Sequence, residues 1–400
     1  MCPLAVAWLC TDLWACDPME ITAKVDASTA YEADRGGART GGVRGRPDPE
    51  NLGTVHVATD SSIGKLATSG SSVPSSIAPE ARRPIVSAVR RAGRRVPGPA
   101  VGLVAIVIAM SVLSPYFLTL NNLSNILTQI SAIGVMAVGE TLVIITGGID
   151  LSVGSVLAVS MMVGAWMFAD MHTPFVVAFI AVLLVGSACG LVNGLLSTFG
   201  RVQPFIATLA TMFAAGGLAL WITNGQPISG FPSWFSAINQ SNIGGVFSIE
   251  DFLMFGVFVA AAFWLHFRPR GRALYAIGGN VEVARLSGLP IRSARIQAYV
   301  VAGLMAGLAG LLVGSQLATA QPTSGTGATD LLSVIAAVVI GGASLSGGVG
   351  KMSGTFIGLL IIGVISNGLS QLNVSPNLEP IVIGAVILVA VLTDRKRRVA

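Results

Sequence analysis

Long apolar stretches alternate with short polar breaks from residue 99 onward, and this pattern predicts a row of membrane-spanning helices. Most of the stretches reach the roughly 20 residues that a helix needs to cross about 30 Å of hydrocarbon. The expected spans are 99–118, 126–147, 152–170, 174–199, 205–223, 251–267, 297–318, 331–349, 354–371 and 379–393. We therefore expect an all-α polytopic membrane protein with about ten transmembrane helices, some of them broken by glycine.

The first 95 residues have a different character. They are polar, rich in Gly, Ser, Ala, Pro and Arg, and show no sustained apolar period. A segment of this composition cannot bury enough apolar surface to offset the entropy lost on ordering. We expect residues 1–95 to form a disordered cytoplasmic extension, residues 96–394 the transmembrane domain, and residues 395–400 a basic cytoplasmic tail.

The positions of the basic residues predict the orientation, because loops rich in lysine and arginine stay in the cytoplasm. With the amino terminus inside, all 24 lysines and arginines fall in cytoplasmic segments. The expected outer loops contain none; they are 119–125, 171–173, 224–250, 319–330 and 372–378. One helix more or fewer would spoil this partition, so we expect both termini in the cytoplasm.

Composition agrees with a membrane protein. Hydrophobic residues make up 53% of the chain and charged residues 11%, against about 25% charged in soluble domains. The net charge of +5 follows from the loop distribution, so we expect no nucleic-acid partner. Four cysteines without a CxxC pair and three scattered histidines predict neither a disulfide framework nor a metal site.

Several spans carry glycines four residues apart. Examples are Gly186 with Gly190, and Gly303 with Gly307. This spacing lets helix backbones approach closely in a membrane. We expect these stripes to pack helices within one chain, with a dimer interface as the alternative.

Glycine also marks a repeat. Residues 147–154 and 341–348 both fit GGxxLSxG, which suggests two related halves. The first copy gives a signature turn with Gly147, Gly148, Asp150 and Ser152. Transporters place Gly-interrupted helices beside their pathway, because broken backbone is tolerated only next to protein or water. We expect the Asp150 carboxylate to cap the helix that follows it.

Polar residues within the spans are candidates for a translocation path. Glu140 lies about two turns before the glycine break; Asn193 and Asn367 each begin an Asn-Gly-Leu sequence, and Gln203 precedes a span. Each of the three amides could equally form a helix-to-helix hydrogen bond. Glu140 could instead be satisfied by neighbouring hydroxyls or lie near an interface.

The loop 268–295 is the longest internal loop after the amino-terminal segment. It contains a short helical candidate, 281–286, with Asn280 as its N-cap and Gly288 as its terminator. A basic loop usually determines topology and contacts anionic lipid, but that role does not require a small capped helix. The outer loop 224–250 carries four aromatic residues, which either form an interfacial belt or dock an external partner.

The run 139–155, with its TGGIDLSVGS core, and the loop 278–288 resemble the ribose-type permease subunits of bacterial ABC importers. The resemblance covers roughly residues 99–394. It implies a ten-helix permease of the bacterial inner membrane, paired with a second permease copy as a homodimer or heterodimer and surrounded by lipid. It also implies that a periplasmic or lipid-anchored sugar-binding protein delivers a monosaccharide and that separate ATPase subunits drive its import.

In that family a coupling helix docks into the ATPase, and it would map onto this loop. Asn280, Glu282, Ala284, Arg285 and Gly288 are the expected coupling residues. The chain carries no GxxxxGK[ST] phosphate loop, so we expect ATP to be bound by the partner, no cofactor on this chain and no enzyme activity. The alternatives are a secondary carrier driven by an ion gradient and, less well supported, a membrane enzyme. The identity of the sugar stays open.

Overall fold

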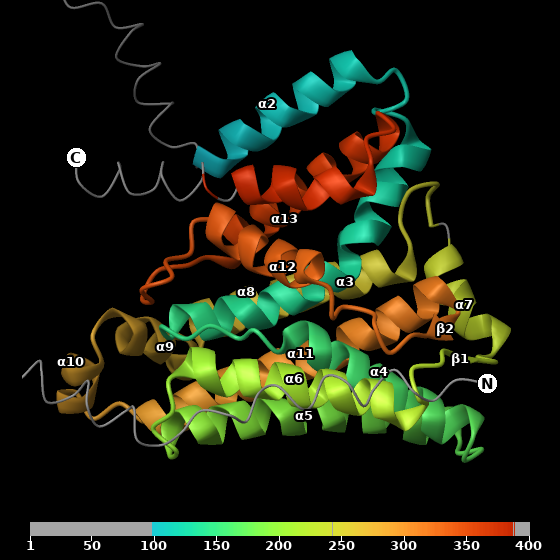
Figure 1. Cartoon of the computed structure of the whole chain (residues 1–400). Coiled ribbons are helices and arrows are strands. Elements are labelled where there is room, and N and C mark those ends of the chain that lie inside the picture. Colours follow the sequence, from blue (N-terminus) through green and yellow to red (C-terminus); the bar gives the residue numbers. More distant parts are fainter. Residues whose placement is uncertain (1–97, 242, 387, 389–400) are drawn as a thin grey trace, which may run out of the picture. The chain divides into compact units, whose positions relative to one another are not determined.

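The computed structural model describes residues 98–241, 243–386 and 388, and most of these are helical (Figure 1). The predicted extension 1–95 and tail 395–400 lie outside the described residues. The helices are α2 (Gly98–Leu113), α3 (Leu120–Ile145), α4 (Val153–Ala169), α5 (Phe175–Thr198), α6 (Pro204–Ile222), α7 (Ser233–Gln240), α8 (Ile249–Phe267), α9 (Pro269–Gly279), α10 (Val281–Leu286), α11 (Ile291–Leu317), α12 (Ala328–Ile340), α13 (Met352–Gln371) and the short 3-10 helix η1 (Pro376–Leu378). Two strands within the described part, β1 (Ile228–Ser229) and β2 (Thr319–Ala320), pair antiparallel with Ile228 opposite Ala320.

The polytopic all-α class is confirmed. Six helices are long and apolar enough to cross a membrane, namely α3, α5, α6, α8, α11 and α13. Helices α2 and α4 and the stretch Asp330–Ile340 are apolar but shorter. The last predicted span, 379–393, is helical from residue 379 to 386 and then leaves the continuously described part. The count of ten spans stays a prediction.

Several predicted bounds differ from the structure, and one helix was not predicted. The predicted span 331–349 is too long, because α12 ends at Ile340 and Gly342 takes a left-handed φ of +90°. Helix α11 begins at Ile291, directly after Pro290 and well before the predicted residue 297. Helix α9 was not predicted, since its arginines mask an apolar side that buries Leu274 and Ile277.

Helix α3 lies at the centre of the helical core. Of its apolar window, 83% is buried, and its packing partners include α8, α11, α12 and α13. A Cβ atom on Gly139 would lie 2.6 Å from the Ala302 Cα of α11, which shows how closely the two backbones approach. The small residues predicted to mediate helix contacts therefore lie at the crossings.

The glycine stripes of α5 and α11 pack against each other. A Cβ atom on Gly186 would overlap the carbonyl oxygen of Gly303, and one on Gly307 would lie 2.8 Å from the carbonyl oxygen of Val182. These stripes therefore hold helices together within one chain, as the first of the two expectations states. Dispersion contacts between the backbones replace a hydrophobic driving force that lipid does not supply.

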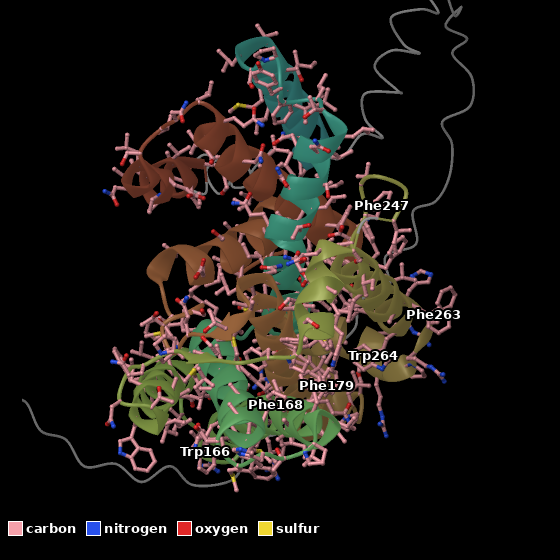
Figure 2. All side chains as sticks on the ribbon, turned by 90° about the vertical axis from the view of Figure 1, so that its right-hand side faces the viewer. Trp166, Phe168, Phe179, Phe247, Phe263 and Trp264 are labelled. Atoms are coloured by element: carbon pink, nitrogen blue, oxygen red, sulfur yellow. The ribbon has the colours of Figure 1, made fainter. Side chains whose placement is uncertain are left out.

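The outer helices expose apolar side chains. Less than a third of the apolar windows of α5, α6 and α8 is buried. Phe213 of α6 is 70% exposed and Phe263 of α8 is 54% exposed. Figure 2 shows Phe263 at the rim of the ribbon rather than between helices. These faces have the composition of lipid-contacting surface.

The predicted outer loop 224–250 folds around an aromatic cluster. Phe235 of α7 is buried, and its ring centroid lies 5.2 Å from that of Phe175. Phe168 stacks on Phe231 at 6.2 Å. Trp234 contacts Phe175 edge-on but remains 52% exposed. The cluster anchors α7, and Trp234 is its exposed member.

Candidate functional site

A hollow lined by hydroxyl and amide side chains lies beside the first turns of α3, and we call it the polar hollow. Its volume is about 540 Å³. The lining residues are Ser124, Asn125, Thr128, Gln129, Asn239, Gln240, Ser241, Gln316, Asn367 and Ser370. Hydroxyl and amide groups both donate and accept hydrogen bonds, and none of these ten side chains is ionisable. The hollow is therefore suited to an uncharged solute rich in hydroxyl groups.

A second cavity, the central cavity, shares Gln129 and Gln316 with the polar hollow. Its volume is about 370 Å³, within the usual range of small-molecule sites. Its wall combines apolar with polar and acidic side chains, contributed by α3, α4, α11, α12 and α13, the segment before α12 and Glu379 after η1. Its further polar lining residues are Ser324, Asp330, Ser333, Ser366 and Glu379. A solute that left the polar hollow for the central cavity would pass Gln129 and Gln316.

The two copies of the glycine repeat meet at the opposite end of α3. Between Gln129 and Ile145 α3 advances roughly 24 Å, at 1.5 Å per residue. There the amide of Gly348 donates to the carbonyl oxygen of Ile145 at 2.9 Å, and a Cβ atom on Gly347 would lie 2.9 Å from the Gly147 Cα. The repeats therefore form two turns that contact each other directly.

The end of α9 enters the same contact, and we call the assembly of both turns with Gly278 and Gly279 the glycine junction. A Cβ atom on Gly278 would overlap the Ile145 carbonyl oxygen, and one on Gly348 would lie 2.8 Å from the Gly279 amide nitrogen. The Tyr275 hydroxyl of α9 donates to the carbonyl oxygen of Gly350 at 3.1 Å. Burial raises the pKa of this phenol, so it stays a hydrogen-bond donor at neutral pH. The end of α9 is thereby in direct contact with both turns.

Helix α10 follows directly, and Figure 1 shows it at the end of the bundle remote from α7. The Asn280 side chain accepts from the amides of Glu282 and Val283, at 3.0 and 3.1 Å. Gly288 ends the helix with a left-handed φ of +71°, and its amide donates to the carbonyl oxygen of Arg285. The predicted short helix with its N-cap and terminator is confirmed.

The exposed face of α10 differs in detail from the expectation. Glu282 and Arg285 form an exposed ion pair at 3.4 Å. Ala284, however, is buried against the chain's own core, so its side chain is not part of the outer face. Leu286 and Val283, which were not predicted, are 88% and 57% exposed. These two side chains supply the exposed apolar surface of α10.

Glu140 and Asp150 belong to a buried hydrogen-bond network. Glu140 accepts from the backbone amide of Asp150 at 3.2 Å. The Asp150 carboxylate accepts from the Ser152 hydroxyl at 2.6 Å, and Asn193 donates to that hydroxyl at 2.8 Å. Thr211 of α6 donates in turn to Asn193. The network ties α3, α4, α5 and α6 together, and its members line neither the polar hollow nor the central cavity.

The expectation that Asp150 caps the next helix needs correction. Its carboxylate accepts from the backbone amide of Ser152 at 2.8 Å, and Ser152 is the N-cap residue of α4 rather than a residue of its first turn. The carboxylate thus closes the turn before the helix. In the second repeat Ser344 occupies the matching position, and its hydroxyl accepts from the Ser346 amide at 3.3 Å.

The remaining predicted path residues lie in three different places. Asn367 of α13 lines the polar hollow, and its Oδ1 atom has no hydrogen-bond partner among the described residues. Asn193 of α5 is in the buried network. Gln203 is exposed at the N-cap position of α6. The Asn-Gly-Leu matches are therefore not equivalent, because Asn367 is in the first helix after its turn and Asn193 in the second.

Comparison with known proteins gives a consistent result. Residues 122–391 match the family described as Branched-chain amino acid transport system / permease component. The chain is 44% identical over 301 residues to the ribose import permease protein of Escherichia coli K12, covering 74% of this chain and 93% of the relative. The ribose import permease protein of Bacillus subtilis 168 is 45% identical over 302 residues (75% and 92%). The D-allose transport system permease protein of Escherichia coli K12 is 38% identical over 297 residues (73% and 90%). No solved structure matches the chain.

Proposed function

The chain belongs to the ABC transporter permease family that contains the ribose and allose permeases, and on that premise we propose its task in an importer. It is the membrane-spanning permease subunit through which a neutral monosaccharide crosses the bacterial inner membrane. A sugar-binding protein outside delivers the sugar, and separate ATPase subunits inside supply the energy. A second permease copy, the same or different, completes the pathway.

The polar hollow is the observation that supports a sugar over an amino acid. Its ten lining residues offer amides and hydroxyls without a formal charge. An amino acid carries an ammonium and a carboxylate, and moving either charge out of water without a partner costs several kcal/mol. A sugar hydroxyl needs only a donor or an acceptor, and every residue of the lining provides one.

The coupling proposal rests on α10 and the glycine junction. Helix α10 is fixed at both ends, by the Asn280 N-cap and by Gly288, so it can move as a rigid unit when a partner binds it. Asn280 directly follows Gly279, which lies against the second turn of the junction. An ATPase that docks on Val283, Leu286 and the Glu282–Arg285 pair would thereby displace the turns of both repeats. Such a series of direct contacts connects the docking face to the bundle, as coupling between two sites requires.

The end of the bundle that carries α7 and the β1–β2 pair is the proposed docking side for the sugar-binding protein. It lies opposite α10 (Figure 1), next to the polar hollow, to which α7 contributes Asn239 and Gln240. With the basic loops in the cytoplasm, this end faces the outside. Sugar released there would enter the hollow directly.

The function is tested with purified permease, its ATPase and its binding protein reconstituted in proteoliposomes. We expect uptake of radiolabelled ribose, allose or a related monosaccharide that requires ATP and binding protein, and no uptake of valine. Uptake driven by an ion gradient without any ATPase would establish the carrier alternative instead. Uptake of valine but of no sugar would contradict the substrate class.

A further inference from the structure

Gln316 of α11 has a contact geometry that leaves one of its atoms free for a solute. Its Nε2 atom donates to the Glu250 carboxylate at 2.8 Å, to the Ser131 hydroxyl at 3.0 Å and to the Thr128 carbonyl oxygen at 3.1 Å. Its Oε1 atom accepts no hydrogen bond from the described residues and is not among the buried unpartnered atoms. Gln316 lines both the polar hollow and the central cavity.

The partners of Gln316 determine which way its amide points. A carboxylate and a backbone carbonyl can only accept hydrogen bonds. The Thr128 carbonyl oxygen lies 3.1 Å from the Gln316 Nε2 atom and has no hydrogen to give. A flipped amide would place the carbonyl oxygen of Gln316 against this acceptor. The amide nitrogen of Gln316 therefore faces the protein, and its carbonyl oxygen faces the polar hollow and the central cavity.

Glu250 is buried in the first turn of α8 and supplies the carboxyl group in this arrangement. Its Oε2 atom accepts from the Gln316 amide at 2.8 Å. The turn itself is fixed, since Ser248 and Asp251 form a capping box. Glu250 is thus a rigid acceptor that holds the Gln316 amide.

We propose that Gln316 is a sugar-recognition residue at the boundary between the polar hollow and the central cavity, and that Glu250 is its positioning residue. The Gln316 Oε1 atom accepts a hydrogen bond from a hydroxyl of the passing sugar. The ligand class is a neutral polyol, whose hydroxyls can donate to such an acceptor. The exposed amide of Gln129 on α3, which lines the same two spaces, supplies both a donor and an acceptor to the same solute. This inference rests on the proposed function and names the residue that recognises the sugar by a hydrogen bond.

The first experiment compares two amide truncations in the reconstituted complex. Gln316→Leu removes the acceptor, while Gln371→Leu removes an amide that bridges Ser114 and Asn122 and lines neither space. Sugar uptake and ATP hydrolysis stimulated by loaded binding protein are measured together. We expect Gln316→Leu to lower the sugar moved per ATP about tenfold, which is the effect of one unmade hydrogen bond of 1.4 kcal/mol, with ATP hydrolysis kept. We expect Gln371→Leu to leave that ratio unchanged.

The second experiment tests the positioning role by exchanging the two side chains. Glu250→Gln lets the amide at position 316 turn around, and Gln316→Glu sets two carboxylates against each other, so we expect each to lower the ratio. The double variant with both changes restores an amide-to-carboxylate bond between the two positions and leaves a carboxylate oxygen facing the polar hollow, although its other oxygen meets the Thr128 carbonyl oxygen. We expect the double variant to exceed both single variants without reaching the ratio of the unchanged chain.

A third measurement follows sugar occupancy without turnover. A Gln129→Cys variant, with Cys2, Cys10, Cys16 and Cys189 all replaced by alanine, is labelled in vesicles with a hydrophilic methanethiosulfonate. We expect ribose to slow the labelling, and Gln316→Leu to abolish that protection.

The outcomes separate the two proposals. If the unchanged complex moves no sugar with ATP, the proposed function fails. If it moves sugar and Gln316→Leu keeps the wild-type ratio, or the exchanged pair does no better than the single variants, the sugar-recognition role is refuted. Protection by ribose that persists in Gln316→Leu would refute it as well.

Discussion

Leu286 on α10 offers a direct test of the proposed docking of an ATPase on this helix. The side chain is 88% exposed, so nearly all of its apolar surface is available for burial in a partner. Leu286→Ala removes three carbon atoms, each worth about 0.8 kcal/mol when buried. Allowing for the exposed fraction, the lost docking energy is about 2 kcal/mol, which corresponds to about a 30-fold weaker Kd.

The assay measures binding of the ATPase to the chain in nanodiscs. Because Leu286 contacts little of its own chain, the thermal stability of the variant should match that of the unchanged protein. Ser287→Ala is the matched control, since the Ser287 hydroxyl donates only to the Val283 carbonyl within the same short helix and should leave the Kd unchanged. A Kd for Leu286→Ala within twofold of the control would refute docking through this face.

Three further predictions follow from the packing, the buried network and the helix cap. Gly307→Ala should destabilise the fold by about 1–3 kcal/mol, because its Cβ would lie 2.8 Å from a backbone carbonyl oxygen. The control Gly217→Ala meets nothing within 4 Å and should be neutral or slightly stabilising. Thermal unfolding in detergent distinguishes the two variants, and equal losses of stability would show that the close helix crossing does not determine the stability of the fold. Glu140→Gln keeps an acceptor for the Asp150 amide, so ATP-driven uptake should stay at more than half of the wild-type rate, and its loss together with a dependence on the proton gradient would favour a carrier. Asn280→Ala should cost α10 about 1 kcal/mol of capping energy and increase hydrogen exchange in that helix alone, so that unchanged exchange would contradict the cap.

Local sequence signals were sufficient for some of these features. The α10 helix was predicted with its boundaries, because an N-cap asparagine and a left-handed glycine act on neighbouring residues. Apolar runs placed α5 and α13 within two residues of the observed bounds. Helix α12 was predicted too long, because its Gly-rich continuation is apolar enough to resemble a span but adopts left-handed turns.

Most of the residues that line the polar hollow and the central cavity could not be predicted from the sequence. Among the predicted path residues Asn367 lies in the polar hollow, whereas Glu140 and Asn193 lie in a buried network. Gln316 carried no local signal, because its orientation depends on Glu250 in a different helix, 66 residues away. Glu250 itself looked like the end of an outer loop. Long-range pairings of single polar side chains leave no periodicity that a pattern could detect.

The glycine junction, through which we propose that α10 acts on the bundle, is insensitive to mapping by alanine truncation. Apart from the Tyr275 hydroxyl bond, its contacts join backbone atoms of Gly278, Gly347, Gly348 and Ile145, so truncating other side chains leaves them in place. At Gly278 and Gly347 the harm comes from added atoms. A complete substitution profile of the protein would therefore show every replacement penalised there, with alanine the mildest, and the cost would rise with the volume introduced rather than with the chemistry removed.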